Sequence, residues 1–263
     1  MPRGGSRTGG PSSGAIRVGR ACRMAHAAVR WRAAVAGVLR FGPEPRGREE
    51  RSMMADGSPR RPAATDVSRL PQPAFSGRRS VETALRLRRS VRDYTGEPLT
   101  RAELAQLLWA AQGITGAEGL RTAPSAGARY PLEVYVSVGD VIDLPTGIYR
   151  YEPEYHALVI VASGDGRAEL CAAALGQPCV EAGAVVIALA ADYGRTGARY
   201  GKRGIRYVHM EAGHAAQNVY LQAAALELGT VVVGAFDDEE AQRILGMPSR
   251  EEPLCLMPVG RIA

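Results

Sequence analysis

A helical pattern over residues 205–228 is the longest in the chain and constrains its fold more than any other feature. Six of its side chains fall near one stripe of a helix: Tyr207, Met210, His214, Leu221, Ala225 and Leu228. Gly229 ends the pattern, and residues 230–233 are typical of a buried strand. A second apolar run, residues 184–190, suits a central strand. The chain therefore combines a long helix with a sheet.

Signals for helix starts define two shorter helices. Ser80 can cap a helix whose apolar spacing covers residues 81–87. Thr100-x-x-Glu103 is a capping-box pattern, worth about 1 kcal/mol, and opens a helix that continues to Gly113. Further patterns predict strands at 132–138 and 254–259, a hairpin of 147–151 with 157–161, and helices at 167–175 and 237–245. Because strands and helices do not alternate regularly, this order favours an α+β fold over a doubly wound one.

Charge is divided unevenly along the 263 residues. Residues 1–62 contain 13 Arg and 4 Asp or Glu, a net charge of +9, whereas the remainder contains 20 basic and 23 acidic residues, a net charge of −3. A mildly acidic body argues against a nucleic-acid-binding core. Residues 1–75 are rich in Gly, Pro, Ser, Arg and Ala, which indicates disorder or a true start at Met53 or Met54, although residues 25–41 faintly resemble a targeting peptide. We expect the folded domain to comprise residues 76–263.

Several common kinds of site find no support in the sequence. No stretch approaches the roughly 20 apolar residues that span a bilayer, so no membrane partner is expected. His209 and His214 lack the spacing of a helical zinc site, and the four cysteines form no CxxC pair, so no metal is expected. No G-x-G-x-x-G pattern follows a strand, which leaves a Rossmann nicotinamide site unsupported. Scattered cysteines are typical of a reducing compartment, and we expect a cytoplasmic protein.

Three segments carry groups suited to a ligand. Residues 88–94, Arg-Arg-Ser-Val-Arg-Asp-Tyr, place three guanidinium groups and a hydroxyl within five residues, which suits a phosphate or a ribityl chain. Residues 123–131, Ala-Pro-Ser-Ala-Gly-Ala-Arg-Tyr-Pro, form a loop whose small residues let a flat ligand approach the backbone. Residues 231–236 contain Gly234 after an apolar run, where backbone N–H groups can face a ring edge. Each segment alone is also compatible with an ordinary turn.

In their order along the chain, these segments resemble the nitroreductase family. RRSVRDY is followed by APSAGARYP, by EAGHAAQNVYLQAAALELG, and by VVVGAF, LGMP and PVGR, from about Val81 to Ile262. Within the family, the chain is most similar to the SagB-type branch, which includes oxidases of thiazole- and oxazole-containing peptides. The resemblance implies an α+β fold with a central mixed, mainly antiparallel sheet flanked by helices. It also implies an intertwined homodimer with an FMN at each of two subunit interfaces.

The resemblance further implies which residues hold the flavin. Arg88, Arg89, Ser90 and Arg92 would bind its phosphate and ribityl chain, Pro124, Ser125 and Ala126 would contact it from the partner subunit, Val233 and Gly234 would lie along the ring near N5, and Arg261 would reach the phosphate. The helix over residues 205–228 would be a main element of the dimer. Ala128 and Tyr130 stand where the family has Asn and Gln, which leaves the flavin contacts of that loop open.

By the same resemblance the chain is an FMN-dependent oxidoreductase. NAD(P)H is the expected donor, and hydride would pass through flavin N5 to a small organic acceptor with ping-pong kinetics. One alternative is an oxidase of azoline rings in modified peptides, and another is a degenerate flavin-binding protein without turnover. SagB-type oxidases carry a Lys-Tyr pair before the long helix, matched here by Arg199 and Tyr200, our candidate catalytic residues. Since Arg stays protonated it is a poor base, which weakens the azoline-oxidase interpretation unless Tyr200 or Lys202 serves.

Overall fold

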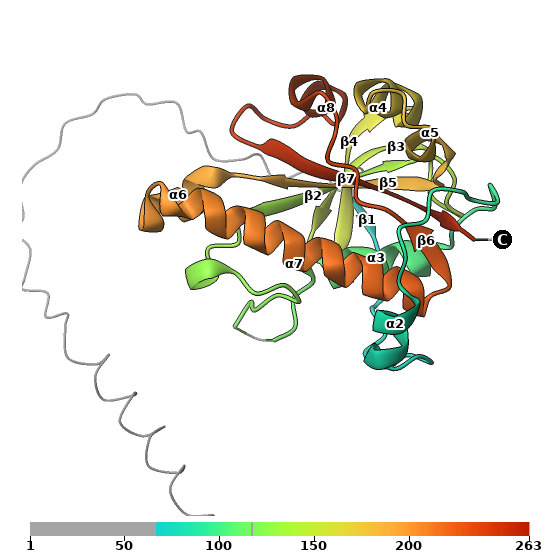
Figure 1. Ribbon diagram of the computed structural model, residues 1–263, viewed down its shortest axis with the longest axis horizontal. Coiled ribbons are helices and arrows are strands. Elements are labelled where there is room, and N and C mark those ends of the chain that lie inside the picture. Colours follow the sequence, from blue (N-terminus) through green and yellow to red (C-terminus); the bar gives the residue numbers. More distant parts are fainter. Residues whose placement is uncertain (1–66, 117, 263) are drawn as a thin grey trace, which may run out of the picture. The chain divides into compact units, whose positions relative to one another are not determined.

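The computed structural model describes residues 67–116 and 118–262. The predictions of a targeting segment, of a start at Met53 or Met54, and of disorder over residues 1–66 concern residues that lie outside this range. The described chain forms a seven-stranded sheet with helices on both faces, as the α+β prediction required (Figure 1).

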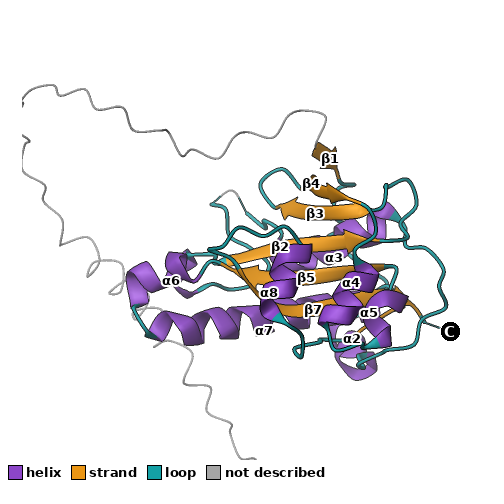
Figure 2. Ribbon diagram, turned by 90° about the horizontal axis from the view of Figure 1, so that it is seen from above, coloured by secondary structure: helices purple, strands orange, loops and turns teal. Residues whose placement is uncertain are grey.

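Every pairing between neighbouring strands of the sheet is antiparallel, in the order β1-β4-β3-β2-β5-β7-β6 (Figure 2). The strands are β1 (Val67–Arg69), β2 (Leu132–Val138), β3 (Gly147–Glu152), β4 (Ala157–Ser163), β5 (Val185–Ala191), β6 (Leu228–Thr230) and β7 (Glu252–Arg261). Side chains of β5 alternate between two cores: Val185, Ile187 and Leu189 face one, and Val186 and Ala188 face the other. Because both faces are covered, the strand is apolar without interruption.

Helices divide between the two faces of the sheet. α3 (Arg101–Gln112) and α7 (Arg203–Ala225) cover one face, and α4 (Arg167–Ala173), α5 (Pro178–Ala182) and α8 (Asp238–Ile244) cover the other (Figure 1). α2 (Val81–Leu87) packs near the C-terminal end of α7, and α6 (Tyr193–Tyr200) lies at its N-terminal end. The side chains of α7 in the core are small: Val208, Ala212, Ala215, Ala216, Val219 and Ala223. The helix therefore lies close to the strands.

Both predicted helix caps are confirmed. The Ser80 hydroxyl accepts the Thr83 N–H at 3.2 Å at the start of α2. At the start of α3, Thr100 accepts the Glu103 N–H at 3.2 Å and the Glu103 carboxylate accepts the Thr100 N–H at 2.7 Å. These caps were predictable because they depend only on residues three positions apart.

The boundary expected at residue 76 is wrong, because the sheet begins earlier. β1 pairs with β4, and Leu70 is buried in the core. The Ala74 N–H donates to the Gln106 side chain of α3 at 2.8 Å. Residues 67–75 thus belong with the sheet rather than with the N-terminal extension.

The strand expected at 230–233 is also wrong. β6 ends at Thr230, Val232 is exposed, and Val233 forms only an isolated bridge with Leu256. The helix expected over 205–228 spans Arg203–Ala225, so Leu228 belongs to β6 instead. α5 and α6 were not predicted, and α6 contains two glycines, which are weak helix formers.

Candidate functional site

The arginine segment that follows α2 runs along the edge strand β6. Ser90 forms a parallel bridge with Thr230, and the Val91 N–H donates to the Thr230 carbonyl at 2.9 Å. Arg88 is half-buried there, whereas Arg89 is exposed. The backbone of the segment is therefore held by the sheet while its arginine side chains reach the surface.

Tyr220, on α7, joins two of the segments that the sequence singled out. Its hydroxyl lies 3.1 Å from the Ser90 hydroxyl and accepts the Val232 N–H at 2.8 Å. The Arg88 guanidinium lies over its ring, 5.1 Å from the centroid. The structure thus brings residues 88–90 and 231–234 together around one tyrosine.

A groove of about 560 Å³ opens beside Tyr220, at the C-terminal end of α7. Four guanidinium groups line it, with Tyr220 and Thr230 between them: Arg79, Arg88, Arg89 and Arg261. Arg79 pairs with Glu227 and Arg261 with Glu103, but Arg88 and Arg89 have no carboxylate partner within the described chain. The buried Thr230 hydroxyl makes no hydrogen bond among the described residues. Uncompensated positive charge beside an unpaired hydroxyl suits a phosphate or a polyhydroxy chain.

Arg261 is held firmly at the rim of this groove. Its guanidinium donates to both carboxylate oxygens of Glu103, at 3.0 and 3.2 Å, and to the Pro98 carbonyl at 3.0 Å. Glu103 also forms the capping box of α3. Arg261 is therefore oriented by α3, and its charge is compensated by the Glu103 carboxylate inside the fold.

Three other residues expected to contact the flavin do not line the groove: Arg92, Val233 and Gly234. Arg92 is exposed and lies outside the lining; its charge opposes the burial that raises the pKa of the Cys179 thiol. Val233 is buried and exchanges backbone hydrogen bonds with Leu256 at 2.8 and 2.9 Å. Gly234 is exposed, with open space where a side chain would stand. A ligand can approach the backbone at this glycine.

The loop at the N-terminal end of α7 is held in a strained shape. Gly127, Ala128 and Tyr130 have φ of 60°, 52° and 46°, and two of them are not glycine. The Ser125 hydroxyl accepts the Tyr130 N–H at 2.9 Å, which closes the turn. Pro124 is exposed, whereas Ser125 and Ala126 are half-buried. Strain of this kind persists where the surroundings support it, and often marks a functional loop.

Arg199 and Tyr200 form the last turn of α6 and pack directly on this loop. A Cβ added to Gly127 would lie 2.6 Å from the Tyr200 hydroxyl and 3.2 Å from Arg199 Nη1. The Tyr200 ring meets that of Tyr207 edge-on, with centroids 5.1 Å apart. The two candidate catalytic residues therefore share one surface with Pro124–Ala126.

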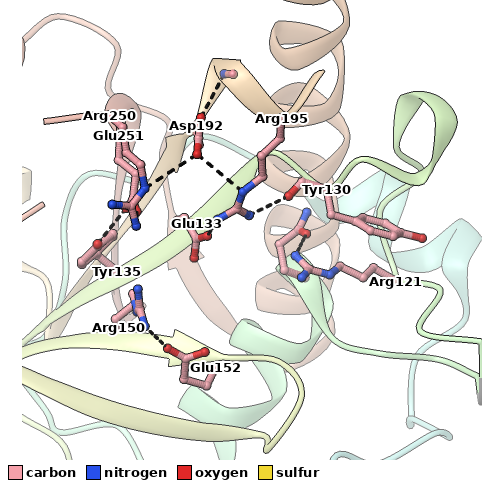
Figure 3. A network of polar contacts seen from close by, with 12 residues as sticks. Arg121, Tyr130, Glu133, Tyr135, Arg150, Glu152, Asp192, Arg195, Arg250 and Glu251 are labelled. Atoms are coloured by element: carbon pink, nitrogen blue, oxygen red, sulfur yellow. Dashed lines mark hydrogen bonds and ion pairs between the residues drawn. The ribbon is translucent and has the colours of Figure 1, made fainter. Parts of the chain in front are cut away.

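Arg195 clamps the loop to the sheet, and the sequence did not reveal it (Figure 3). Its guanidinium donates to the Tyr130 carbonyl at 3.0 Å and pairs with Glu133 of β2, while Asp192 lies 3.7 Å away. Arg129 donates back to the Arg195 carbonyl at 3.0 Å. These bonds fix α6 and the loop as one unit.

Glu211 is a second residue that sequence reasoning missed. It lies on α7 and is only 2% exposed, and one carboxylate oxygen makes no hydrogen bond within the described chain. Burial raises its pKa to about 7, although a hydrogen bond from Ser125 and the charge of Arg121 favour the ionised form. A signal existed, because Glu211 stands three residues after Val208 and four before Ala215, both of which face the core, but it required knowing which face is buried.

Within one chain, the residues around Tyr220 lie far from the loop that contacts Tyr200. Arg88 and Ser90 contact Tyr220, whereas Tyr200 contacts Tyr207, and these tyrosines are separated by roughly 20 Å along α7 at a rise of 1.5 Å per residue. Figure 1 accordingly shows α2 and α6 at opposite ends of α7. The two groups therefore form separate surfaces within one chain.

The described residues provide neither a metal site nor a membrane-spanning helix. No group of His, Cys, Asp and Glu there could hold a metal ion. None of the helices in that part of the chain combines the length and apolarity needed to cross a membrane.

Comparison with known families gives a match over most of the sheet domain. The family model described as the nitroreductase family matches residues 85–261. A protein of Methanocaldococcus jannaschii whose name assigns it to the nitroreductases is 52% identical over 181 residues, which is 69% of this chain and 90% of that protein.

Two other proteins are informative. A solved structure from Ralstonia eutropha, described as that of a nitroreductase, has a TM-score of 0.67 at 31% identity and covers 81% of this chain and 96% of its own. The trifolitoxin operon protein TfxC of Rhizobium leguminosarum bv. trifolii is 25% identical over 229 residues, covering 74% of this chain and 64% of that protein.

Proposed function

This chain belongs to the nitroreductase family of oxidoreductases, and from that premise we propose that it is an FMN-dependent enzyme that uses NAD(P)H to reduce a small organic acceptor. The observation that carries the proposal is the groove at Tyr220, where Arg88 and Arg89 stand without carboxylate partners. The groove lies between residues 88–94 and 231–236, two of the segments expected to hold the flavin, and this position supports its assignment as the flavin site.

The groups present fit the phosphate and ribityl parts of FMN. Arg88 and Arg89 would bind the phosphate, and the Ser90 and Thr230 hydroxyls would meet the ribityl chain. Gly234 would admit the ring close to the backbone, with Val233 behind it. When bound, FMN supplies a carrier that accepts a hydride equivalent from a donor and passes the electrons to an acceptor.

A homodimer would complete the site. Pro124, Ser125 and Ala126 lie toward the opposite end of α7 from Arg88, so the resemblance that assigns both to one flavin requires two subunits. Large apolar side chains remain exposed along this side of the molecule: Val81, Leu85 and Leu87 on α2, and Ile205 and Met210 on α7. An exposed apolar surface of this kind supports a subunit interface over the outer side of α7.

The roles of Arg199 and Tyr200 follow from their chemistry and position. Arg199 remains charged and would attract an anionic substrate or stabilise developing negative charge, rather than act as a base. The Tyr200 hydroxyl can donate a proton, and it lies against Gly127 of the loop proposed to contact the flavin. Both would therefore act on the flavin of the partner subunit.

The first measurement is the visible spectrum of the purified protein, with the released cofactor identified by mass. We expect one FMN per chain, and steady-state oxidation of NAD(P)H with a quinone or nitroarene as acceptor. A colourless protein that does not take up added FMN would reject the proposal. FMN binding without turnover would instead identify a degenerate flavin-binding protein.

The second candidate is oxidation of azoline rings in a modified peptide. It is favoured by the resemblance of the chain to the SagB-type branch, whereas Arg199 at the position of the lysine weakens it, because Arg is a poor base. Anaerobic mixing separates the two candidates, because an azoline peptide would bleach the flavin spectrum by itself. NAD(P)H would bleach it only in the reductase.

A further inference from the structure

The junction of α6 and α7 carries positive charge with no negative charge among it. Residues 193–210 contain four Arg and one Lys but no Asp or Glu, whereas residues 63–192 and 211–263 contain 15 basic and 23 acidic residues. Arg195 is the one cation of this run that forms an ion pair within the described chain. The other four are exposed, and we call them the basic surface: Arg199, Lys202, Arg203 and Arg206. A positive region of this kind on an otherwise acidic domain attracts anions.

The charge of the basic surface lies where it opposes helix stability. α7 begins at Arg203, its first turn contains no acidic residue, and Lys202 at the N-cap makes no side-chain hydrogen bond. Helix N-termini favour acidic residues and caps such as Ser or Asp, because their first N–H groups carry partial positive charge. α8 follows this rule, since Asp237 caps it and its first turn contains three acidic residues. A local rule broken by several residues together indicates a functional surface.

Three members of the basic surface line a groove of about 610 Å³ at the start of α7: Lys202, Arg203 and Arg206. Arg203 and Arg206 are three positions apart and are therefore neighbours on the helix surface. Like charges at this spacing repel one another, and an anion bound between them relieves the repulsion. The groove therefore suits a ligand that carries a carboxylate, a phosphate or a similar oxyanion.

The basic surface continues the surface that would face the flavin of the partner subunit. Arg199 and Tyr200 end α6 and pack on the loop at Gly127. Lys202 follows two residues after Tyr200. Arg129, in the same loop as Gly127, is exposed and has no carboxylate partner within the described chain. A substrate that reaches Tyr200 would therefore pass through the field of these charges.

We propose that the basic surface selects an anionic acceptor, one that carries a carboxylate, sulfonate or phosphate group beside its reducible centre. The proposal rests on the function proposed above and specifies the class of its acceptor. Exposed charges of one sign raise the association rate of an oppositely charged substrate by about 10- to 1,000-fold, and salt weakens the effect steeply. An acceptor without charge gains nothing from the same residues.

The test compares two acceptors that differ in charge. Steady-state kcat/KM is measured for 1,4-naphthoquinone and for its 2-sulfonate, at salt concentrations of about 10 mM and about 1 M, where the Debye length is about 30 Å and about 3 Å. Arg203→Gln with Arg206→Gln removes two charges and leaves Arg199 and Tyr200 in place. For the sulfonate, kcat/KM should fall about tenfold at low salt and less than about twofold at high salt. For the uncharged quinone it should not change.

The matched control is Arg69→Gln with Arg243→Gln, two exposed arginines on β1 and α8. It removes the same net charge and should leave kcat/KM of both quinones within about twofold of the original values. NAD(P)H is itself an anion, so its own kcat/KM is measured separately. In a ping-pong scheme kcat/KM for the acceptor does not depend on how the donor binds, so the two effects can be told apart.

The outcomes are distinguishable. Equal losses for the two quinones, no loss for the sulfonate, or an equal loss in the control would overturn the anionic acceptor while leaving the flavin enzyme intact. A protein that oxidises NAD(P)H with neither quinone would remove the proposed function and this inference with it.

Discussion

The two ends of α7 differ in how their charges are compensated. At the C-terminal end, Arg88 and Arg89 face an open groove without carboxylate partners. At the N-terminal end, Arg195 is bonded to Glu133 and to the Tyr130 carbonyl. Inside the fold at that end, the uncompensated group is a buried acid, Glu211. One end is thus suited to bind an anion, and the other to hold a loop in a fixed shape.

Under the proposed function, the two ends have the properties that a flavin site divided between two subunits requires. A surface that binds phosphate needs free cations, which repel one another and remain exposed until the ligand arrives. A surface that contacts a flat ring needs a rigid backbone, and internal bonds supply that rigidity. Because the two surfaces lie at opposite ends of α7, the unpaired arginines of one do not disturb the internal bonds that hold the other rigid.

The largest expected effect comes from removing the positive charge at the C-terminal end of α7. Replacing Arg88 and Arg89 together with Ala should weaken FMN binding at least about 100-fold, because each charge-assisted hydrogen bond contributes about 1.5 to 3 kcal/mol. Isothermal titration with FMN measures this loss. Arg92→Ala should change affinity by less than about threefold, since Arg92 lies outside the groove.

The matched control for that pair is Arg78→Gln with Arg86→Gln, two exposed arginines that do not line the groove. It removes the same net charge and should leave flavin affinity unchanged. Stoichiometric FMN in the Arg88 and Arg89 variant would contradict the assignment of the groove.

The next effect concerns Glu211, the buried carboxyl group toward the N-terminal end of α7. The pKa of Glu211 is raised from 4.5 to about 7 in the folded chain, so the folded protein holds this proton more tightly than the unfolded chain. Stability is then highest below pH 4.5 and falls as the pH rises to about 7, by up to about 3 kcal/mol. Glu211→Gln should gain this amount relative to the original protein between low and neutral pH.

Urea unfolding of both proteins at several pH values measures that gain. Because other groups titrate equally in the two, the difference isolates Glu211. A difference that does not vary with pH would show that the pKa of Glu211 is the same in the folded and unfolded chain, and would contradict the raised pKa.

Local features of the fold could be predicted from sequence, and those that depend on distant residues could not. The caps at Ser80 and Thr100 and the alternation of β5 follow from neighbours a few positions away. The strand expected at residues 230–233 was wrong because Val233 pairs with Leu256 only in an isolated bridge, and no continuous strand forms there.

The same limit applies to the site. The motifs identified Arg88, Arg89 and Ser90, which the structure places around Tyr220. They did not reveal Arg195, because its partners lie about 60 residues away and α6 itself, with two glycines, gave no helical signal. Burial of Glu211 likewise depends on a loop far earlier in the chain.

A smaller effect is expected at the N-terminal end of α7, where Arg195 holds the loop. Arg195→Gln should destabilise the protein by about 1 to 3 kcal/mol, because Glu133, whose side chain is 15% exposed, loses its partner. Amide exchange of residues 126–130 should rise with it. Arg243→Gln, which breaks an exposed ion pair with Glu240 within α8, is the control and should cost less than about 0.5 kcal/mol. Equal losses in both variants would contradict the clamp.

The smallest effect compares two tyrosines on one helix. Tyr220→Phe removes the hydroxyl that meets Ser90 and the Val232 N–H, so FMN affinity should fall about fivefold, equivalent to about 1 kcal/mol. Tyr207→Phe, whose hydroxyl makes no hydrogen bond within the described chain, should leave affinity within about twofold. Both are measured by titration with FMN. If Tyr207→Phe proved the more damaging, the flavin phosphate would lie at the N-terminal end of α7, and the roles of the two ends would be exchanged.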